Sequence, residues 1–257
     1  MYFLDETWVN EGHTVSKVWV DSNIKTKKQA FLSGLTTGLK NPSGKGRRLI
    51  LLHIGSDDDF LERGELIMES KKTVDYHEEM TGDIFINWLK KILPLLLPNS
   101  VIIMDNAPYH SVKLDCVPMK QWLKNDIIEW MDAKGIEHRN DMVKDELIHQ
   151  IKAANIDRKY DKFVVDSLAE QAGHKVLRFL SYHCVLNPIE SVWSQVKGHI
   201  ARNNKTFKLC EVRGLLHDGI KLVTSDMWWS FIHSVEKEEQ KFWKSDDLCD
   251  RVIINSS

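Results

Sequence analysis

The sequence has few cysteines and no motif that would pair them. Its four cysteines are widely separated, and none belongs to a Cys-x-x-Cys pair: Cys116, Cys184, Cys210 and Cys249. This spacing indicates neither a zinc site nor a disulfide framework. Scattered cysteines of this kind are typical of a reducing intracellular compartment.

Long apolar runs are also absent. No stretch approaches the run of about 18 apolar residues that a membrane-spanning helix needs. The opening residues, Met1 to Asp5, do not have the pattern of a signal peptide. We therefore expect no membrane partner.

The chain lacks an excess of either charge. Its 257 residues include 35 basic and 37 acidic side chains, which gives a formal net charge of −2. This balance argues against a protein that binds nucleic acid over its whole surface, but it leaves room for a local basic patch. With 42% apolar residues, the chain is long enough for one domain, or for one domain with an insertion.

The most informative stretch present runs from Val101 to His110 (Val-Ile-Ile-Met-Asp-Asn-Ala-Pro-Tyr-His). Its four apolar residues predict a strand that is buried on both faces. The strand ends in Asp105, and Pro108 cannot continue the ladder. A carboxylate at the mouth of a buried strand is costly unless it is paired or binds a metal. Asp105 could also be a simple turn residue, so this stretch alone leaves both roles open.

Two further carboxylates have comparable positions. Asp5 follows a short apolar run that begins at Tyr2, and this pattern predicts a strand ending at Asp5. Glu190 lies in the first turn of a helix that we expect to begin after Asn187, because Asn is a good N-cap and Pro188 suits the first helical position. The structural alternative for Glu190 is a capping box with Asn187.

Together these three carboxylates predict a metal site. Strand-end aspartates on neighbouring strands would lie a few ångströms apart, and a helix packed on the sheet could deliver Glu190. Clustered carboxylates repel one another, and a bound cation offsets that repulsion. Oxygen ligands without cysteine select Mg²⁺ or Mn²⁺. Two such ions about 4 Å apart would clamp the attacking and leaving oxygens of phosphoryl transfer.

Hydrophobic periodicity predicts the remaining elements. Strands are expected at 15–21, 48–54, 65–69 and 175–180, and helices at 79–93 and 224–243. The aromatic residues of the last helix are assigned to packing rather than to base stacking: Trp228, Trp229, Phe231 and Phe242. The acidic run 57–59 is interpreted as an exposed turn, and the loop 24–48 as either a solvated loop or a phosphate-contacting one.

Three motifs together resemble the DDE transposases of the mariner superfamily. They are Leu4–Trp8 (Leu-Asp-Glu-Thr-Trp), Met104–His110 and Leu186–Trp193 (Leu-Asn-Pro-Ile-Glu-Ser-Val-Trp), and their order and context match the family. The resemblance implies an α/β fold that is RNase H-like, with a mixed five-stranded sheet flanked by helices. A helical insertion, at about 112–173, would lie between the fourth and fifth core strands, and a plain structural role for it is favoured over a small DNA-binding module.

The resemblance also implies a site and an activity. Asp5, Asp105 and Glu190 would form the catalytic triad that binds two Mg²⁺ or Mn²⁺ ions. The chemistry would be cut-and-paste transposition, in which water hydrolyses a DNA strand at the transposon end and the freed 3′-hydroxyl attacks target DNA. The expected partners are the transposon ends and the target DNA, together with a second subunit reached through the loop 8–48. The expected location is the nucleus.

Two features depart from the family pattern. Asp105 and Glu190 are 85 positions apart, which is longer than in the simplest members, and the insertion accounts for the excess. Members also usually carry helix-turn-helix domains ahead of the catalytic core, so we expect sequence-specific DNA capture to reside outside these 257 residues. Residues 1–208 would form the catalytic domain, and 209–257 a helical extension packed on it.

Four more residues are candidates for DNA contacts. Asn106 and His110 follow the second aspartate and would border the DNA path, although His110 could instead be a buried, hydrogen-bonded histidine. Lys197 and Arg202 belong to a stretch that has basic residues and no acidic ones up to Lys208. That stretch is either a phosphate-facing stripe or a solvated face.

Two other functions stay open at this point. One is a domesticated or truncated remnant that binds DNA without cleaving it, although intact carboxylates at all three positions count against simple decay. The other is a different RNase H-like nuclease, such as an RNA–DNA hybrid cutter or a junction resolvase. The Asn-Pro-Ile-Glu helix start favours the transposase.

Overall fold

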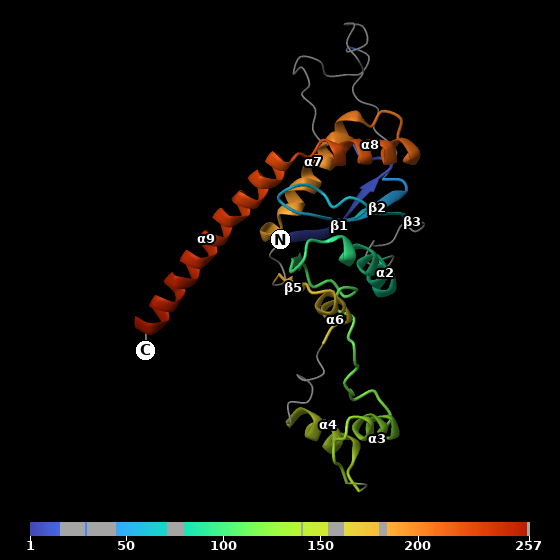
Figure 1. Ribbon diagram of the computed structural model, residues 1–257, viewed down its shortest axis with the longest axis vertical. Helices are drawn as coiled ribbons and strands as arrows, with labels where there is room; N and C mark the ends of the chain where they lie inside the picture. The colour runs from blue at the N-terminus through green and yellow to red at the C-terminus, as the bar shows by residue number, and fades with distance from the viewer. Residues whose placement is uncertain are drawn as a thin grey trace.

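One mixed five-stranded sheet forms the centre of the computed structural model, which describes residues 1–15, 29, 45–70, 80–139, 141–153, 162–179 and 184–255 (Figure 1). The strand order is β3-β2-β1-β4-β5. β1 pairs with β2 and β2 with β3 in antiparallel fashion, whereas the β1–β4 and β4–β5 pairs are parallel. The predicted mixed sheet is confirmed. Its strands are β1 (Tyr2–Asn10), β2 (Arg48–Gly55), β3 (Leu66–Ser70), β4 (Val101–Met104) and β5 (Lys175–Arg178).

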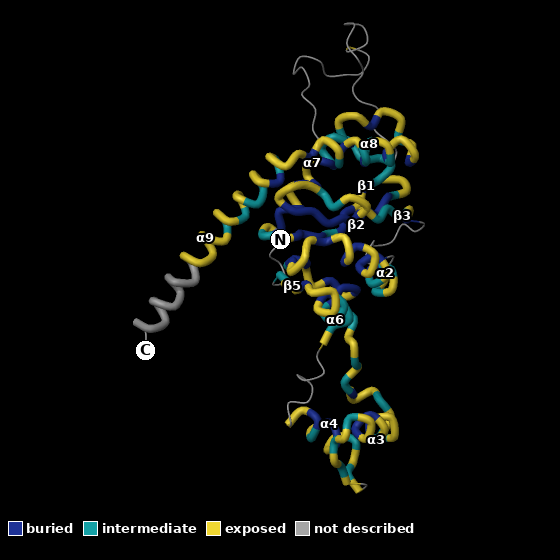
Figure 2. Tube along the Cα trace, in the orientation of Figure 1, coloured by how far each residue is buried: buried dark blue, intermediate teal, exposed yellow. Residues whose placement is uncertain are grey.

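The central strands are buried on both faces, as Figure 2 shows for β1 and β2. Successive side chains of a strand point to opposite faces, so each central strand contributes side chains to two apolar clusters, one on each face of the sheet. Leu4 and Ile50 belong to one apolar cluster, and Phe3 and Leu49 belong to the other. This is why β2 reads as a nearly continuous apolar run rather than as an alternating one.

Helices cover each face of the sheet (Figure 1). α2 (Gly82–Ile92) and α6 (Val164–Gln171) contribute to the cluster that contains Leu4. α7 (Pro188–Asn203), α8 (Leu209–Lys221) and the first turns of α9 (Ser225–Asn255) contribute to the cluster that contains Phe3. α2 begins at Thr81, whose hydroxyl accepts a hydrogen bond from the Ile84 amide, and the short 3₁₀ turn η2 (Leu93–Leu95) with Pro94 follows it.

The predicted end of β1 at Asp5 is wrong. β1 continues to Asn10 and pairs with β2 along its whole length. The prediction assumed that adjacent acidic residues, Asp5 and Glu6, would stop a buried strand. The strand tolerates Glu6 because a histidine from elsewhere in the chain neutralises it inside the core, as described below.

The segment between β4 and β5 contains a helical pair with its own core. α3 (Lys124–Ala133) and α4 (Lys144–Ala153) enclose a third apolar cluster that includes Trp130 and Leu147. The chain leaves and returns at one place, where Lys113 bridges Phe163. α6 follows that bridge and packs on the sheet, not on the helical pair. Ten acidic and nine basic residues between 114 and 162 give the pair no net positive charge of the kind that marks a DNA-binding module.

The last helix is longer than predicted and only its start is packed. α9 extends away from the body of the molecule in Figure 1. Trp228 is fully buried, but Trp229 is 62% exposed and Phe242 is 39% exposed. The assignment of these aromatics to packing is therefore confirmed for Trp228 and Phe231, which belong to the cluster that contains Phe3, but not for Trp229 and Phe242. In the part of the chain that the structure describes, no helix has the length and apolar character to cross a membrane.

Two predictions fall on residues outside the described ranges. The expected strand at 15–21 and most of the loop 24–48 belong to these. The other predicted strands and helices are present, and apart from β1 and α9 their ends differ by a few residues.

Candidate active site

The register of two parallel strands brings the first two carboxylates together. In the β1–β4 pair, Phe3 lies beside Ile103. The same offset of 100 positions places Asp5 level with Asp105, directly after β4 has ended at Met104. Asp105 therefore follows its strand as predicted, whereas Asp5 sits within a strand that continues past it. The two carboxyl groups are near enough for Asp105 to raise the pKa of Asp5.

A side-chain hydrogen bond joins the helix that carries the third carboxylate to this point. The Asn187 amide donates to the carbonyl of Leu4 at 3.2 Å, one residue before Asp5. Asn187 precedes α7 as predicted, but its side chain does not cap the helix. The capping box is thus absent, because Asn187 connects α7 to β1 instead. Glu190, in the first turn of α7, is left exposed on the side of the carboxylates.

Asp5 faces α7, in the layer that contains Phe3. The indole Nε1 of Trp193 donates to Asp5 Oδ2 at 3.1 Å. Burial, together with repulsion from Glu6, Glu190 and Asp105, raises the pKa of Asp5 well above its usual range. His53 lies opposite Asp5 on β2, but burial lowers the pKa of His53 to about 3. That histidine is neutral near pH 7 and gives Asp5 no counter-charge.

Glu190 shares its surroundings with Lys197, which lies about two turns further along the same face of α7. Partial burial raises the pKa of Glu190; Lys197 lowers it, and Asp105 raises it further. Desolvation lowers the pKa of Lys197, and the nearby carboxylates of Glu190 and Asp5 raise it. The Lys197 ammonium lies 4.9 Å from the ring centroid of Trp8, an arrangement that suits a cation–π contact. Lys197 is therefore part of the carboxylate site rather than a remote surface residue.

Asp105 is held from the other layer of the sheet by a buried histidine. His110 Nδ1 lies 2.7 Å from Asp105 Oδ1, and His110 Nε2 lies 2.9 Å from Glu6 Oε1. Burial alone would lower the pKa of His110, but Glu6 and Asp105 outweigh burial and raise it to about 10. A side chain with no exposed surface cannot touch DNA. The prediction of His110 as a DNA contact is therefore wrong, and the buried, hydrogen-bonded alternative is what the structure shows.

The remaining predicted contacts are at the surface. The Asn106 amide donates to the carbonyl of Phe179 at 2.9 Å, so Asn106 joins the turn after β4 to the end of β5 while remaining exposed. Arg202 is exposed in the last turn of α7, with its guanidinium folded back over Gly198. Asn106 follows Asp105 directly in the chain, but its side chain is directed to Phe179.

The chemistry of the site suits a hard divalent cation. Among the described residues, no three Asp, Glu, His or Cys side chains are placed so that together they could hold a metal ion as they stand. The three carboxylates are nevertheless close enough for Asp105 and Glu190 each to raise the pKa of Asp5. Their donor atoms are all oxygens, which Mg²⁺ and Mn²⁺ prefer, and their repulsion is what a cation would relieve. The residues therefore fit such an ion.

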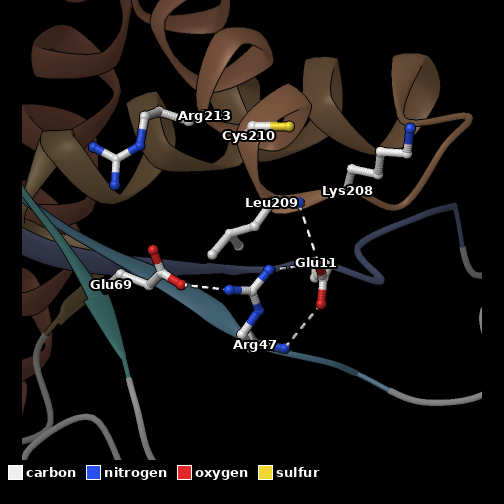
Figure 3. A pocket seen from close by; sticks show the side chains of 7 residues that line it. All are labelled: Glu11, Arg47, Glu69, Lys208, Leu209, Cys210 and Arg213. Atoms are coloured by element: carbon white, nitrogen blue, oxygen red, sulfur yellow. Dashed lines mark hydrogen bonds and ion pairs between the residues drawn. The ribbon is translucent and has the colours of Figure 1, made fainter.

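A separate cavity lies at the stem of the segment 16–44. It has a volume of about 450 Å³ and is lined by Glu11, Arg47, Glu69, Lys208, Leu209, Cys210 and Arg213 (Figure 3). The Glu11 amide donates to the carbonyl of Arg47 at 2.7 Å, and Glu11 Oε1 accepts from the Leu209 amide at the start of α8. Arg47 bridges Glu11 and Glu69. Glu11 thus joins one end of the stem to α8, and Arg47 joins the other end to Glu11; none of the three carboxylates of the site lines the cavity.

Sequence reasoning missed two partners of the site. Glu6 was read as part of a strand end, although alternation along a longer strand would have sent its side chain to the opposite face from Asp5. The helical spacing of Ile189, Trp193 and Val196 indicates only packing for Trp193, although an indole also carries a donor that usually finds a partner when buried. No local pattern could have identified the bond between His110 and Glu6, which are 104 positions apart.

Comparison with known proteins agrees with this geometry. Residues 45–212 match the family described as DDE superfamily endonuclease. A search of curated proteins found no match. The fold is similar to the Mos1 mariner paired end complex with Mn (14% identity, TM-score 0.57, 95% of this chain and 55% of that one) and the same complex with Mg (15%, 0.57, 95% and 55%). It is also similar to the Mos1 strand transfer complex (15%, 0.54, 95% and 54%). The chain spans about half the length of these proteins.

The raised pKa of Asp5 predicts that this residue costs stability when no metal is bound. A carboxyl whose folded-state pKa exceeds the ordinary 3.8 destabilises the fold as pH rises from about 4 through the folded-state pKa. Asp5→Asn removes that charge. In metal-free buffer the variant should therefore unfold at a higher urea concentration than the wild type at pH 8, and the gap should narrow at pH 4.5.

Asp58→Asn, in the exposed turn after β2, is the matched control and should show no such gap. Adding Mg²⁺ should raise the urea midpoint of the wild type but not that of Asp5→Asn, because only a folded protein that binds the ion gains stability from it. Equal urea midpoints for Asp5→Asn and the wild type at pH 8 would contradict the claim that the ionised Asp5 carboxylate destabilises the metal-free fold.

Proposed function

Because this chain belongs to the DDE superfamily of endonucleases, we propose that it is the catalytic core of a cut-and-paste DNA transposase. The observation that carries the proposal is the convergence of Asp5, Asp105 and Glu190. Parallel register sets the first two level, and a helix joined to β1 through Asn187 brings the third. Burial and the neighbouring carboxylates raise the pKa of Asp5, and burial and Asp105 raise that of Glu190; shifts of this kind cluster at functional sites.

Asp5, Asp105 and Glu190 would together hold two divalent ions through their carboxylate oxygens. When bound, such ions lower the pKa of water and neutralise the charge that develops on a phosphodiester. The fit rests on the oxygen donors and on the repulsion described above. Mos1 complexes with Mn and with Mg have the same fold, which supports the choice of ion.

The substrate would be a DNA phosphodiester. In the first step a water oxygen bonds to phosphorus and the bond to the 3′-oxygen breaks, which leaves a 3′-hydroxyl and a 5′-phosphate. In the second step that 3′-hydroxyl bonds to a phosphorus of target DNA, and the target's own 3′-oxygen leaves. Lys197 lies beside Glu190 and Asp5, where its ammonium would bind the phosphate under attack. Trp193 holds Asp5 through both steps.

Partners and location follow from the same proposal. The titles of the Mos1 structures name a paired end complex and a strand transfer complex, and DNA at transposon ends and target would be the corresponding partners here. A second copy of the chain would be reached through the segment 8–48, whose stem is fixed on α8 by Glu11. The nucleus is the expected compartment for this chemistry.

The proposal predicts metal-dependent nicking that depends on each carboxylate. Asp5→Ala, Asp105→Ala and Glu190→Ala should each lower the rate of Mn²⁺-dependent nicking of supercoiled plasmid by at least about a hundredfold, a loss typical for removal of a group that stabilises the transition state. Gel analysis of nicked product over time measures this.

Asp58→Ala should nick at the wild-type rate, because its side chain lies in an exposed turn. If wild-type protein that binds DNA gives no nicking with Mn²⁺ or Mg²⁺, the non-catalytic remnant becomes the better account. Cleavage of RNA–DNA hybrids in preference to DNA would support the other nuclease.

Two basic residues of α7 should carry part of the salt dependence of DNA binding. Lys197→Gln and Arg202→Gln should each reduce the slope of log K against log salt concentration by about one, because one phosphate contact is lost. Fluorescence anisotropy with a duplex oligonucleotide between about 50 and 200 mM salt measures the slope. Lys120→Gln, on the exposed surface of the insertion, should leave it unchanged. An unchanged slope in the α7 variants would support a solvated face.

A further inference from the structure

A buried anchor lies beneath the second aspartate of the site. His110 contacts Glu6 Oε1 through Nε2 at 2.9 Å and Asp105 Oδ1 through Nδ1 at 2.7 Å. The side chains of Glu6 and His110 are 2% and 1% exposed, whereas that of Asp105 is 52% exposed. The three groups thus form a chain of hydrogen bonds that leads from the core of the protein to the open carboxylate.

The imidazole in this chain is fixed from several sides. The ring of Phe85 lies 4.2 Å from it and that of Tyr109 lies 4.7 Å from it, measured between centroids. The backbone is held as well, because the His110 amide donates to the Ala107 carbonyl and Arg178 donates to the His110 carbonyl at 3.2 Å. A ring with these neighbours cannot turn without disrupting the α2 layer.

Asp105 needs such support because it lies beyond the sheet. β4 ends at Met104, so no ladder bond orders the residue that follows. Its Oδ1 accepts from two directions, the Ala107 amide at 3.0 Å and His110. Two donors on one oxygen set the plane of the carboxylate, and only one of them, His110, is itself held by a buried charge.

We propose that His110 and Glu6 are positioning residues that set the orientation of Asp105 for metal binding. This inference rests on the proposed function, since it assigns a role at the same site. Groups that hydrogen-bond to a metal ligand typically contribute about 10–100-fold in metal affinity or activity. A purely structural role for the buried pair would instead affect the free energy of unfolding and leave the metal affinity of the folded protein unchanged.

Two substitutions at position 110 separate these roles. In His110→Asn the amide nitrogen takes roughly the place of Nδ1 and can still donate to Asp105. In His110→Gln it takes roughly the place of Nε2 and can reach Glu6 only. Each substitution therefore removes one of the two hydrogen bonds that His110 makes. Calorimetric titration of the full chain with Mn²⁺ should show about 10–100-fold weaker binding for His110→Gln and a clearly smaller loss for His110→Asn.

A matched control is available in a second buried histidine. His174 accepts from the Ser100 amide at 3.3 Å and its Nε2 lies 3.1 Å from the Leu93 carbonyl, at the opposite end of β4. His174→Gln should lower the urea midpoint without weakening Mn²⁺ binding. This control removes loss of stability as an explanation for a change in affinity.

A double variant keeps the test valid if His110→Gln does not fold. Glu6→Leu/His110→Phe replaces the buried ion pair with apolar groups of similar size, an exchange that is often neutral for stability, and it should still weaken Mn²⁺ binding about 10–100-fold. Wild-type affinity in a folded Glu6→Leu/His110→Phe protein, or equal affinities in the Asn and Gln variants, would overturn the inference. A wild type that binds no Mn²⁺ would instead contradict the proposed function.

Discussion

Mutual repulsion among three carboxylates is the physical constraint around which the site is built, because neighbouring side chains must hold the three groups close together. Asp5, Asp105 and Glu190 converge at the point where β1 continues and β4 stops. Each meets a different kind of partner, yet burial and the remaining repulsion still raise the pKa of Asp5 well above its usual range. The partners are the indole of Trp193, the imidazole of His110 and the ammonium of Lys197, respectively.

Because successive side chains of β1 point to opposite faces of the sheet, the partners of the carboxylates lie in two layers. Asp5 points toward α7, and Glu6, the next residue, points into the layer of α2, where it pairs with His110. A substitution in the α7 layer would therefore affect Asp5, and one in the α2 layer would affect Asp105 through His110. Burying an ion pair is rarely favourable for stability alone. Its presence under Asp105 is better explained by the geometry that it imposes on the carboxylate.

The sequence predicted the features that local chemistry controls. A four-residue apolar run ending in Asp105 and a helix beginning at Pro188 both leave clear local signals, and both are found. The continuation of β1 past Asp5 could not be predicted, because it depends on a histidine 104 positions from Glu6. The same holds for Asn187, whose residue type suits a cap but whose side chain binds Leu4 across 183 positions. Contacts distant in sequence decide the details of the site, while local patterns decide the elements that carry it.

The most direct test of the account is the position of bound metal. Crystals of the chain grown with Mn²⁺ would give anomalous difference density for that ion alone. The account predicts peaks within about 2.0–2.6 Å of carboxylate oxygens of Asp5, Asp105 and Glu190, the range for hard divalent cations. Anomalous density elsewhere, with none at these three carboxylates under saturating Mn²⁺, would contradict it.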